Sequence, residues 1–406
     1  MDTVSKQKRS EIMSWVKRKD SKVETLFYKE LWKAGFRYRK NSGKYFGKSD
    51  MVIKYKNMKD SKFYIEHTGK VAEAGSRFEH VMAITLDPRT ANKEGIIRCI
   101  TSRTGEYGSS GQIDRSALFK IKGETLEKFE ITEELKIRNS EAIIKKLKGE
   151  GGDFIGLEDP DIWIDEQNDL MHVYFTMPIK TKNKEGKNIW NVNLGHAVGK
   201  NLDSLEMTEP TLLGSRDRNA KEISVAHLNS KGFRYNLIES SNKRGEWTYS
   251  TVQVAIAHDM GKPWKFGEIV FHPADHNLSW IGGHASPGPL LPKSFVDLGE
   301  NKMLGIMNGC EANKKVDNKT KYGTFSIGLF IYDYENGKID WISPEPLIQD
   351  SEVSEKRAIT FASQFVETKA GEGILYAHVD DSFVRAYTLN GKEIGTILPR
   401  VDNSRK

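Results

Sequence analysis

The sequence contains very little cysteine. Only Cys99 and Cys310 occur among its 406 residues, and they lie far apart and outside any Cys-x-x-Cys spacing, so neither a disulfide framework nor a thiolate zinc site is indicated. The sequence also lacks an apolar run long enough to cross a bilayer, and its first residues lack the apolar core of a signal peptide. These absences lead us to expect a cytoplasmic protein, in a reducing compartment and without a membrane partner.

The net charge is also small, +6 over the whole chain, but it is unevenly distributed. Residues 1–62 are dense in lysine and arginine, whereas the remainder is close to balanced. A basic segment fits contact with nucleic acid, and a solvated helix face gives the same composition. The length exceeds what one ordinary core supports, so the sequence predicts either a large domain with an appendage or two domains.

The basic N-terminal segment carries helix and strand signals. Apolar residues recur at three- and four-residue spacing across residues 7–34, which predicts helix, and Gly35 is expected to end it. Residues 49–55 indicate a strand with an acidic residue at its start. This segment resembles the very-short-patch-repair (Vsr) mismatch endonuclease family, and the matching stretches are Lys8–Met13, Lys19–Glu24, Gly35–Asn41 and Gly47–Asp50.

The resemblance implies a pair of catalytic carboxylates. In that family a helix glutamate and a strand aspartate hold the metal that activates water, and the matching positions here are Glu24 and Asp50. The resemblance stops near residue 62, before a complete nuclease sheet, so we expect residues 1–62 to be a truncated nuclease-like segment. The alternatives are an active DNA endonuclease that needs a divalent metal, and a basic cap on the main domain.

From about residue 71 the helical periodicity nearly disappears. Short apolar and aromatic runs are separated by Gly, Asn, Asp and Lys, which indicates an all-β architecture; the charged run 132–148 is the exception, a short helix or a long loop. Strand pairs with a terminal aromatic residue recur at blade-length intervals, with starts near residues 78, 157, 222, 279 and 357. The spacing predicts a five-bladed β-propeller over residues 71–400, with a small N-terminal α/β appendage. A β-sandwich is the alternative fold.

Five short motifs in this region are similar to those of one enzyme family. They are Gly156–Pro160, Lys221–His227, Ser286–Leu291, Arg357–Ala362 and Leu375–Asp381. Together they resemble the five-bladed β-propeller glycosidases of the mannoside phosphorylase and inverting 1,2-mannosidase family. The resemblance spans most of residues 78–390 and implies an enzyme whose partner is a glycoside or oligosaccharide, with Asp159 delivering the proton.

Two departures from the family bear on the reaction. Asp161 stands where the family motif has arginine, which changes the charge beside the family's carboxylate. Glu239 stands where the phosphorylases carry a His-Arg pair that resembles a phosphate clamp, and a carboxylate there repels phosphate. We therefore expect an inverting hydrolase that acts on mannosides or related oligosaccharides. A mannoside phosphorylase is the nearest alternative, and a non-catalytic carbohydrate-binding propeller is the other.

Glycoside hydrolysis needs one carboxyl group that protonates the leaving oxygen and a second that activates water. With Asp159 as the acid, Glu239 and Glu222 are the first candidates for the base and Glu311 is in reserve, because each lies where an apolar strand ends. The residues expected to bind substrate are Arg115, Lys221, Trp280, His284, Arg357 and Asp381. For each of these the alternative is structural: an ion pair, a core histidine or packing inside a blade. No cofactor is expected for the main domain.

Overall fold

The computed structural model describes residues 63–399, apart from 68, 106–111, 184, 317–318, 322 and 350–358, together with the backbone of two earlier strands. The chain divides into two compact units, Met1–Ser61 and Lys62–Lys406. In the first unit, β1 (Arg37–Lys40) pairs with β2 (Met51–Lys54) in antiparallel register, and β2 lies within the strand predicted over 49–55. The helices predicted over 7–34, and with them Glu24 and Asp50, lie outside the described residues.

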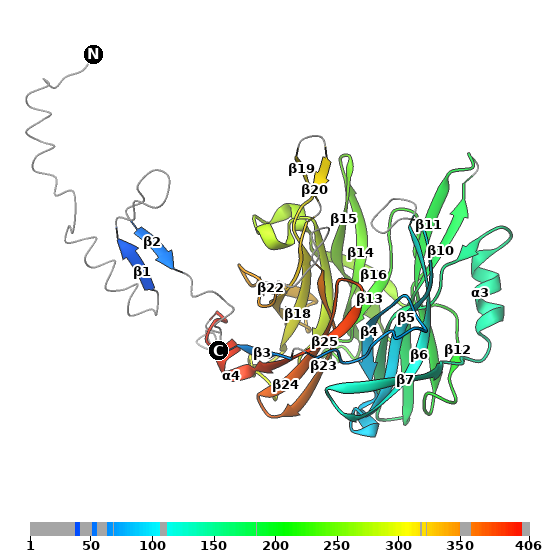
Figure 1. The fold of residues 1–406 in the computed structure, drawn as a ribbon, viewed down its shortest axis with the longest axis horizontal. Coiled ribbons are helices and arrows are strands. Elements are labelled where there is room, and N and C mark those ends of the chain that lie inside the picture. Colours follow the sequence, from blue (N-terminus) through cyan, green and yellow to red (C-terminus); the bar gives the residue numbers. More distant parts are fainter. Residues whose placement is uncertain are drawn as a thin grey trace, which may run out of the picture. The chain divides into compact units, whose positions relative to one another are not determined.

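The described part of the second unit is nearly all β, as predicted (Figure 1). Apart from one hairpin, its strands form two four-stranded sheets, one five-stranded sheet and one eight-stranded sheet, and the eight-stranded sheet consists of two antiparallel groups joined by a parallel bridge between Ser250 and His284. The sheets therefore comprise five antiparallel groups of strands. The first group contains β4 (His80–Leu86), β5 (Glu94–Thr104), β6 (Ile113–Thr125) and β7 (Lys128–Glu134). The second contains β9 (Glu158–Asp165), β10 (Leu170–Lys182), β11 (Asn188–Gly199) and β12 (Glu206–Met207), with the short β8 (Asp153–Phe154) also beside β10.

The remaining strands repeat this arrangement. The third group contains β13 (Lys221–Ser224), β14 (Arg234–Arg244), β15 (Trp247–Ala257) and β16 (Lys265–Phe271). The fourth contains β17 (His284–Leu290), β18 (Lys302–Cys310), β21 (Phe325–Asp333) and β22 (Lys338–Ile342), and the hairpin of β19 (Lys314–Val316) and β20 (Lys319–Lys321) lies between β18 and β21 in sequence. The fifth contains β23 (Thr360–Lys369), β24 (Glu372–Val379), β25 (Phe383–Asn390) and β3 (Tyr64–Glu66).

The five groups are joined in a ring through their first strands. In the order β4, β9, β13, β17 and β23, each first strand contacts the next, and β23 in turn contacts β4. The fifth group takes its last strand, β3, from the beginning of the unit, and Glu66 on β3 forms an ion pair of 2.7 Å with Arg385 on β25. The result is a propeller-like arrangement, in which circular repetition protects the sheet edges.

Helices are few among the described residues. The charged run 132–148 divides between the end of β7 and α3 (Ser140–Lys148), which buries Ile143 against the second group and ends with lysines that complement the helix dipole. The other α-helix is α4 (Gly391–Gly395), and short 3₁₀ turns occur at Pro88–Thr90, Pro273–Asp275 and Ser279–Ile281. No helix in the described part of the chain has the length and apolar character needed to cross a membrane.

The hydrophobic core lies between neighbouring groups. Leu118 and Phe119 follow each other on β6, so their side chains point to opposite faces of the sheet. Phe119 packs in the cluster that contains Tyr376 of the fifth group, whereas Leu118 packs in the cluster that contains Phe175 of the second. A strand that is apolar on both faces therefore contributes to two cores, which explains why the predicted strands are continuous apolar runs.

Each first strand has an irregularity in its pairing with the second strand. At three of these bulges a residue other than glycine has a positive φ: Ala83 at 34°, Asp159 at 46° and Glu222 at 49°. This region of backbone space is disfavoured for residues with a Cβ atom, and bulges of this kind re-aim a side chain. Two predicted catalytic residues thus occupy equivalent, strained positions in neighbouring groups.

Candidate active site

The acidic residues predicted for catalysis meet where β9 and β13 begin. Glu158 and Asp159 open β9, and Lys221 and Glu222 open β13. These two first strands are in contact, and the side chains of Asp159 and Glu222 share a hydrogen bond. The fold therefore pairs the carboxyl of Asp159, on β9, with that of Glu222, on β13.

Arg98 on β5 binds Asp159, the member of this pair that lies on β9. Its Nη1 lies 2.9 Å from Oδ1 of Asp159, and its Nη2 lies 2.8 Å from Oε1 of Glu158. Its Nε donates to Oγ of Ser116 at 3.2 Å, and that hydroxyl donates to Oε1 of Glu158 at 3.0 Å. The planar guanidinium can bind two carboxylates and a hydroxyl at once because its donors point in fixed directions. Arg98 thereby fixes both acidic side chains at the start of β9.

Lys221 and His284 hold a third carboxylate, Glu239, on the other side. Lys221 and Glu239 are paired across β13 and β14, and the Lys221 Nζ lies 3.1 Å from Oε1 of Glu239. Nε2 of His284, on β17, lies 3.2 Å from Oε2 of the same carboxylate. The side chain of Glu239 is only 2% exposed, so both of its oxygens face protein groups rather than solvent.

The protonation preferences of Asp159 and Glu222 are opposite. Burial favours the neutral form of Asp159, but the charges of Arg98 and Lys221 outweigh it and hold the pKa of this carboxyl below its usual value. Burial, reinforced by the neighbouring charge of Asp159, raises the pKa of Glu222 well above its usual value. One carboxyl is therefore ionised while the other keeps its proton, which permits the hydrogen bond between them.

Glu239 and Lys221 stabilise each other in their charged forms. Although burial would raise it, His284 and Lys221 keep the pKa of Glu239 far below its usual value. Burial would likewise lower the pKa of Lys221, but the charge of Glu239 raises it above its usual value. The Glu239 side chain is 2% exposed and that of Lys221 is 28% exposed, and a partly buried ion pair of this kind persists where nearby opposite charges compensate both partners.

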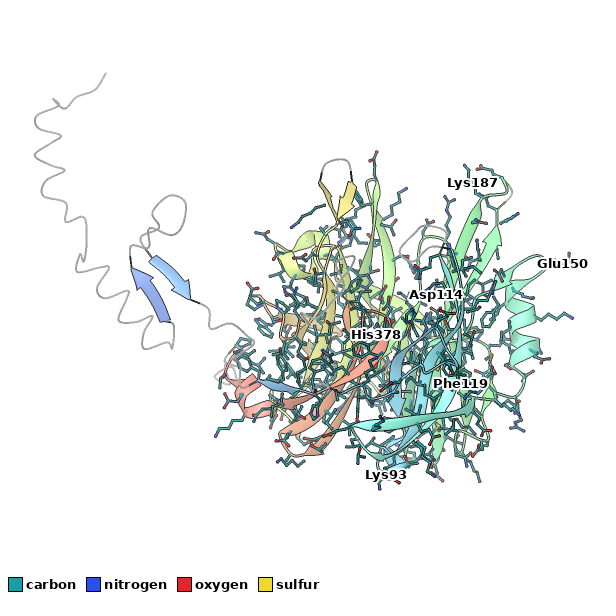
Figure 2. The ribbon with its side chains drawn as sticks, viewed as in Figure 1. Lys93, Asp114, Phe119, Glu150, Lys187 and His378 are labelled. Carbon is teal, nitrogen blue, oxygen red and sulfur yellow. The ribbon has the colours of Figure 1, made fainter. Side chains whose placement is uncertain are left out.

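The fifth group also contributes to the site. Nε2 of His378, on β24, lies 3.3 Å from Oδ1 of Asp381, and the His378 ring stacks on Phe361 with the ring centroids 5.2 Å apart. Figure 2 shows His378 among the side chains between the strands. The interaction with His378 lowers the pKa of Asp159, and the charge of Asp381 favours the charged form of Arg98 by raising its pKa. Side chains from all five groups thus converge on one region.

Two of the described residues expected to bind substrate, Trp280 and Arg115, do not join this cluster. Trp280 is 4% exposed, its Nε1 donates to the carbonyl of Ser343 at 3.1 Å, and it packs in a core cluster of the third and fourth groups. The prediction that it stacks on a sugar is therefore wrong for this structure, because its ring faces are covered. Arg115 binds Asp153 at 2.9 Å and the Phe154 carbonyl, and Arg357 lies outside the described residues.

Sequence reasoning did not single out Arg98. It stands between Ile97 and Cys99, both fully buried, on β5. A cation inside such an apolar run has to be paired when it is buried, and that signal was available in the sequence. Burial raises the pKa of Asp161, a further carboxyl on β9, to about 7. This carboxyl is therefore partly protonated near neutral pH.

The described residues contain no group of three or more His, Cys, Asp or Glu side chains placed to hold a metal ion. The cluster instead consists of carboxylates, two buried cations and two histidines. Such an arrangement can donate a proton from one carboxyl group and stabilise charge with the others.

Comparison with known proteins supports the predicted resemblance at the N-terminal end. Residues 1–63 match the family model of the DNA mismatch endonuclease Vsr. The type II nicking enzymes V.NmeDIP of Neisseria meningitidis serogroup C and V.NmeAIP of N. meningitidis serogroup A are 43% identical over 54 residues and 45% identical over 58 residues. These alignments cover 13% and 14% of this chain, and the chain spans only 36% and 41% of the length of those relatives.

The main domain is similar in fold to carbohydrate-active proteins. One structure is from the GH130 family of mannoside phosphorylases, which contains glycoside hydrolases that target β-1,2 mannosidic linkages in Candida mannan (16% identity, TM-score 0.54, 82% of this chain and 96% of that one). Another is the β-1,2-mannobiose phosphorylase of Listeria innocua with β-1,2-mannobiose, at 12% identity and a TM-score of 0.53, which covers 79% of this chain and 92% of that one. A third is a glycosyl hydrolase of Bacteroides ovatus, at 16% identity and a TM-score of 0.51, which covers 83% of this chain and 93% of that one. The chain thus carries a Vsr-like N-terminal segment and a domain with the fold of mannoside phosphorylases and glycosidases, as the sequence motifs predicted.

Proposed function

We propose that the main domain, residues 71–400, is a five-bladed β-propeller enzyme that hydrolyses mannosides or related oligosaccharides with inversion. Each group of four strands is one blade, and the site lies where all five blades converge. The observation that carries the proposal is the hydrogen-bonded pair of Asp159 and Glu222, one ionised and one protonated. A carboxyl group with a raised pKa is suited to protonate a glycosidic leaving oxygen.

Proton delivery is the role of this pair as a unit. Asp159 was expected to be the acid, but its pKa is lowered and that of Glu222 is raised. We therefore place the transferable proton on Glu222, with Asp159 accepting its hydrogen bond and fixing its orientation. Two carboxyl groups joined by a hydrogen bond are too close to act from opposite faces of a sugar, where inverting enzymes keep them about 6.5–9.5 Å apart. The pair acts from one side of the scissile bond.

Glu239 remains the candidate for the water-activating carboxylate. Its pKa is lowered, which favours the ionised form that a base requires, and Lys221 pairs with its Oε1. Nε2 of His284 lies 3.2 Å from its Oε2, but neither atom has a hydrogen-bond partner among the described residues. The low pKa of Glu239 makes it a weak base, so the proposal requires that water reach it in an orientation that compensates for this. Lys221 contacts Glu239 and acts electrostatically on Glu222 and Asp159, which places the lysine between the two sides of the site.

Water is favoured over phosphate as the attacking group because the cations are already neutralised. Arg98 is bound by Glu158 and Asp159, and Lys221 by Glu239. Phosphate entering this region would face carboxylates with no uncommitted partner among these two cations, whereas water carries no charge to repel. Phosphorolysis is the alternative outcome of the test.

The test measures product release from a panel of α- and β-mannosides and related oligosaccharides, with and without inorganic phosphate. Free sugar should appear without phosphate, with inverted configuration at the anomeric carbon, and Asp159→Asn should abolish it. Asp153→Asn is the matched control, because Asp153 also pairs with an arginine, Arg115, at 2.9 Å, and it should remain active. A phosphate requirement would assign a phosphorylase, and sugar binding without turnover would assign a carbohydrate-binding propeller.

We also propose that residues 1–62 are a truncated Vsr-like segment in which Glu24 and Asp50 correspond to the metal-holding carboxylates. The family match over residues 1–63 supports this segment as a distinct unit, and the curated nicking enzymes extend well beyond the part it matches. The test incubates the full chain with duplex DNA, with and without a mismatch and Mg²⁺. No cleavage is expected. Metal-dependent nicking that is lost in Asp50→Asn would instead show that the segment binds DNA and is an active nuclease.

A further inference from the structure

A cavity lies at the far end of the strand that carries Asp159. β9 begins in the acidic site and ends at Asp165, six residues and therefore about 20 Å further along an extended strand. There a cavity of about 500 Å³ opens between the second and third groups. Its walls include Trp163, Asp165, His172, Leu228, Arg234 and Asp259. The cavity shares no lining residue with the acidic cluster, so it is a separate place on the molecule.

His172 brings an uncommitted buried nitrogen to this cavity. Its residue is 6% exposed. Its Nδ1 lies 2.9 Å from Nε2 of His196, whereas its own Nε2 is buried without a hydrogen-bond partner among the residues that the structure describes. Burial lowers the pKa of both imidazoles, that of His196 to about 3, so both rings are neutral near pH 7. A buried polar atom without a partner is uncommon and costly in a folded protein.

A hydrogen-bond chain links the two histidines to Thr208. Nδ1 of His172 lies 2.9 Å from Nε2 of His196, and Nδ1 of His196 lies 2.7 Å from the hydroxyl of Thr208. That hydroxyl is also within hydrogen-bond distance of the carbonyls of Glu209 and His196, at 3.0 and 3.5 Å, so two proton arrangements fit the chain. A neutral imidazole has one N–H, and Nε2 of His172 is therefore an acceptor in one arrangement and a donor in the other. A ligand group that both donates and accepts can pair with this nitrogen in either case.

The other polar groups of the cavity wall restrict the chemistry of a ligand that could pair with this nitrogen. Asp165 and Asp259 both act electrostatically on His172, and an anion in the cavity would meet these two carboxylates. The guanidinium of Arg234 lies over the Trp163 ring, 5.2 Å from its centroid, and would repel an ammonium group. Hydroxyl groups both donate and accept, so a hydroxylated ligand can pair with His172 in either tautomer, donate to the carboxylates and accept from Arg234.

We propose that this cavity binds a neutral, polyhydroxylated ligand of the size of a mono- or disaccharide. A volume of about 500 Å³ lies in the range of small-molecule sites. The wall also offers apolar surface from Trp163, Met260 and the half-exposed Leu228, against which the carbon face of a pyranose ring packs. The inference does not depend on the proposed hydrolysis, because it concerns other residues.

The experiment uses the full chain with Asp159→Asn, so that turnover does not consume the ligands. Methyl glycosides and β-linked disaccharides of mannose, glucose and N-acetylglucosamine are titrated at millimolar concentrations by calorimetry. The ¹⁵N resonances of the histidines are recorded in parallel. Binding should shift the resonance of Nε2 of His172. His172→Phe, which keeps an aromatic ring and removes both nitrogens, should weaken this binding roughly tenfold or more.

A second variant and a matched control keep the test decisive if His172→Phe does not fold. Asp259 accepts from the backbone N–H of Gly261 at 2.8 Å, and Asp297 accepts from that of Gly299 at 2.9 Å. Asp259→Asn should weaken binding several-fold, whereas Asp297→Asn, with the same turn geometry at another place, should not. Absence of binding by every compound, or binding that is unchanged in both His172→Phe and Asp259→Asn, would overturn the proposal. Neither result would bear on whether the Asp159 site is catalytic.

Discussion

The two ends of β9 bury polar side chains in opposite ways. At its start, Asp159 occupies a strained backbone position and is held by the charge of Arg98. At its end, the strand borders the neutral pair of His172 and His196, which avoids charge altogether. In the first case opposite charges compensate desolvation, and in the second a shifted pKa removes the charge that would need compensation.

This difference indicates where each region is sensitive. A site built on compensated charges fails when one partner is removed, because the remaining charge is left buried and unpaired. A site built on neutral groups fails when the pH imposes a charge on them. The two regions can therefore be distinguished by which perturbation each of them tolerates.

Activity should give the largest difference between the two ends. Glu222→Gln removes the transferable proton and should lower the rate of glycoside release about 10²- to 10⁴-fold. The measurement is initial rate on the best substrate of the mannoside panel. Glu94→Gln is the control, since Glu94 is a half-exposed carboxylate that pairs with Lys122 at 3.4 Å, and its rate should be close to that of the wild type. Equal rates for both variants would remove Glu222 from the mechanism.

Stability should show the next largest effect, at the charged end. Arg98→Met leaves Glu158 and Asp159 buried without their cation and should lower the free energy of unfolding by about 3–5 kcal/mol. The matched control is Arg138→Met. Arg138 pairs with Glu206 at 3.0 Å with side chains 71% and 51% exposed, and loss of such a surface pair changes stability by about 1 kcal/mol or less. Urea denaturation measures both, and similar losses would contradict the assigned role of Arg98.

The neutral end should respond to acid instead. The pKa of His196 is lowered from 6.5 to about 3 by burial, so the unfolded chain binds this proton more readily than the folded one. Its contribution to stability is complete above pH 6.5 and is lost between pH 6.5 and about 3, at up to about 1.4 kcal/mol per pH unit. His196→Gln should flatten this slope in pH-dependent denaturation. The variant His276→Gln, at an exposed histidine, should leave the slope unchanged.

The smallest effect expected is a gain in stability at the catalytic pair. Because the pKa of Glu222 is raised in the folded state, its contribution to stability is present below its ordinary pKa and is lost as the pH rises through the raised value. Glu222→Gln cannot ionise, so relative to the wild type it should gain roughly 1 kcal/mol as the pH rises. Thermal unfolding at several pH values tests this, and a variant that loses stability with rising pH would contradict it.

The fold was largely accessible from the sequence because burial on both faces leaves a strong signal. Residues 173–177 and 325–332, for example, are mostly apolar in sequence, and they lie within β10 and β21. The starts expected near residues 157 and 222 lie within one residue of the starts of β9 and β13. The helical exception was placed correctly but too broadly, because residues 132–134 complete a strand before α3 begins.

The site was only partly accessible. The structure brings Asp159, Glu222, Lys221, Glu239 and His284 together, all of which were chosen from motifs or from strand ends. It separates Trp280 from them, because a tryptophan beside glycines fits a packed core as well as a sugar platform, and the sequence does not distinguish the two. The hydrogen bond between Asp159 and Glu222 could not be foreseen either, since it depends on two bulges that aim side chains from different groups.

The pairing of β3 with β25 has a consequence for how the protein is made. Glu66 and Arg385, which meet across that seam, are 319 residues apart in the sequence. During synthesis, β3 leaves the ribosome with the first group and has no partner until the fifth group has emerged. Contacts between such distant segments form slowly, and an exposed strand edge is prone to pair with other chains in the meantime. The first strand of this domain to be made is the last to find its neighbour, so deleting the fifth group would leave an open ring with an unprotected edge at each side.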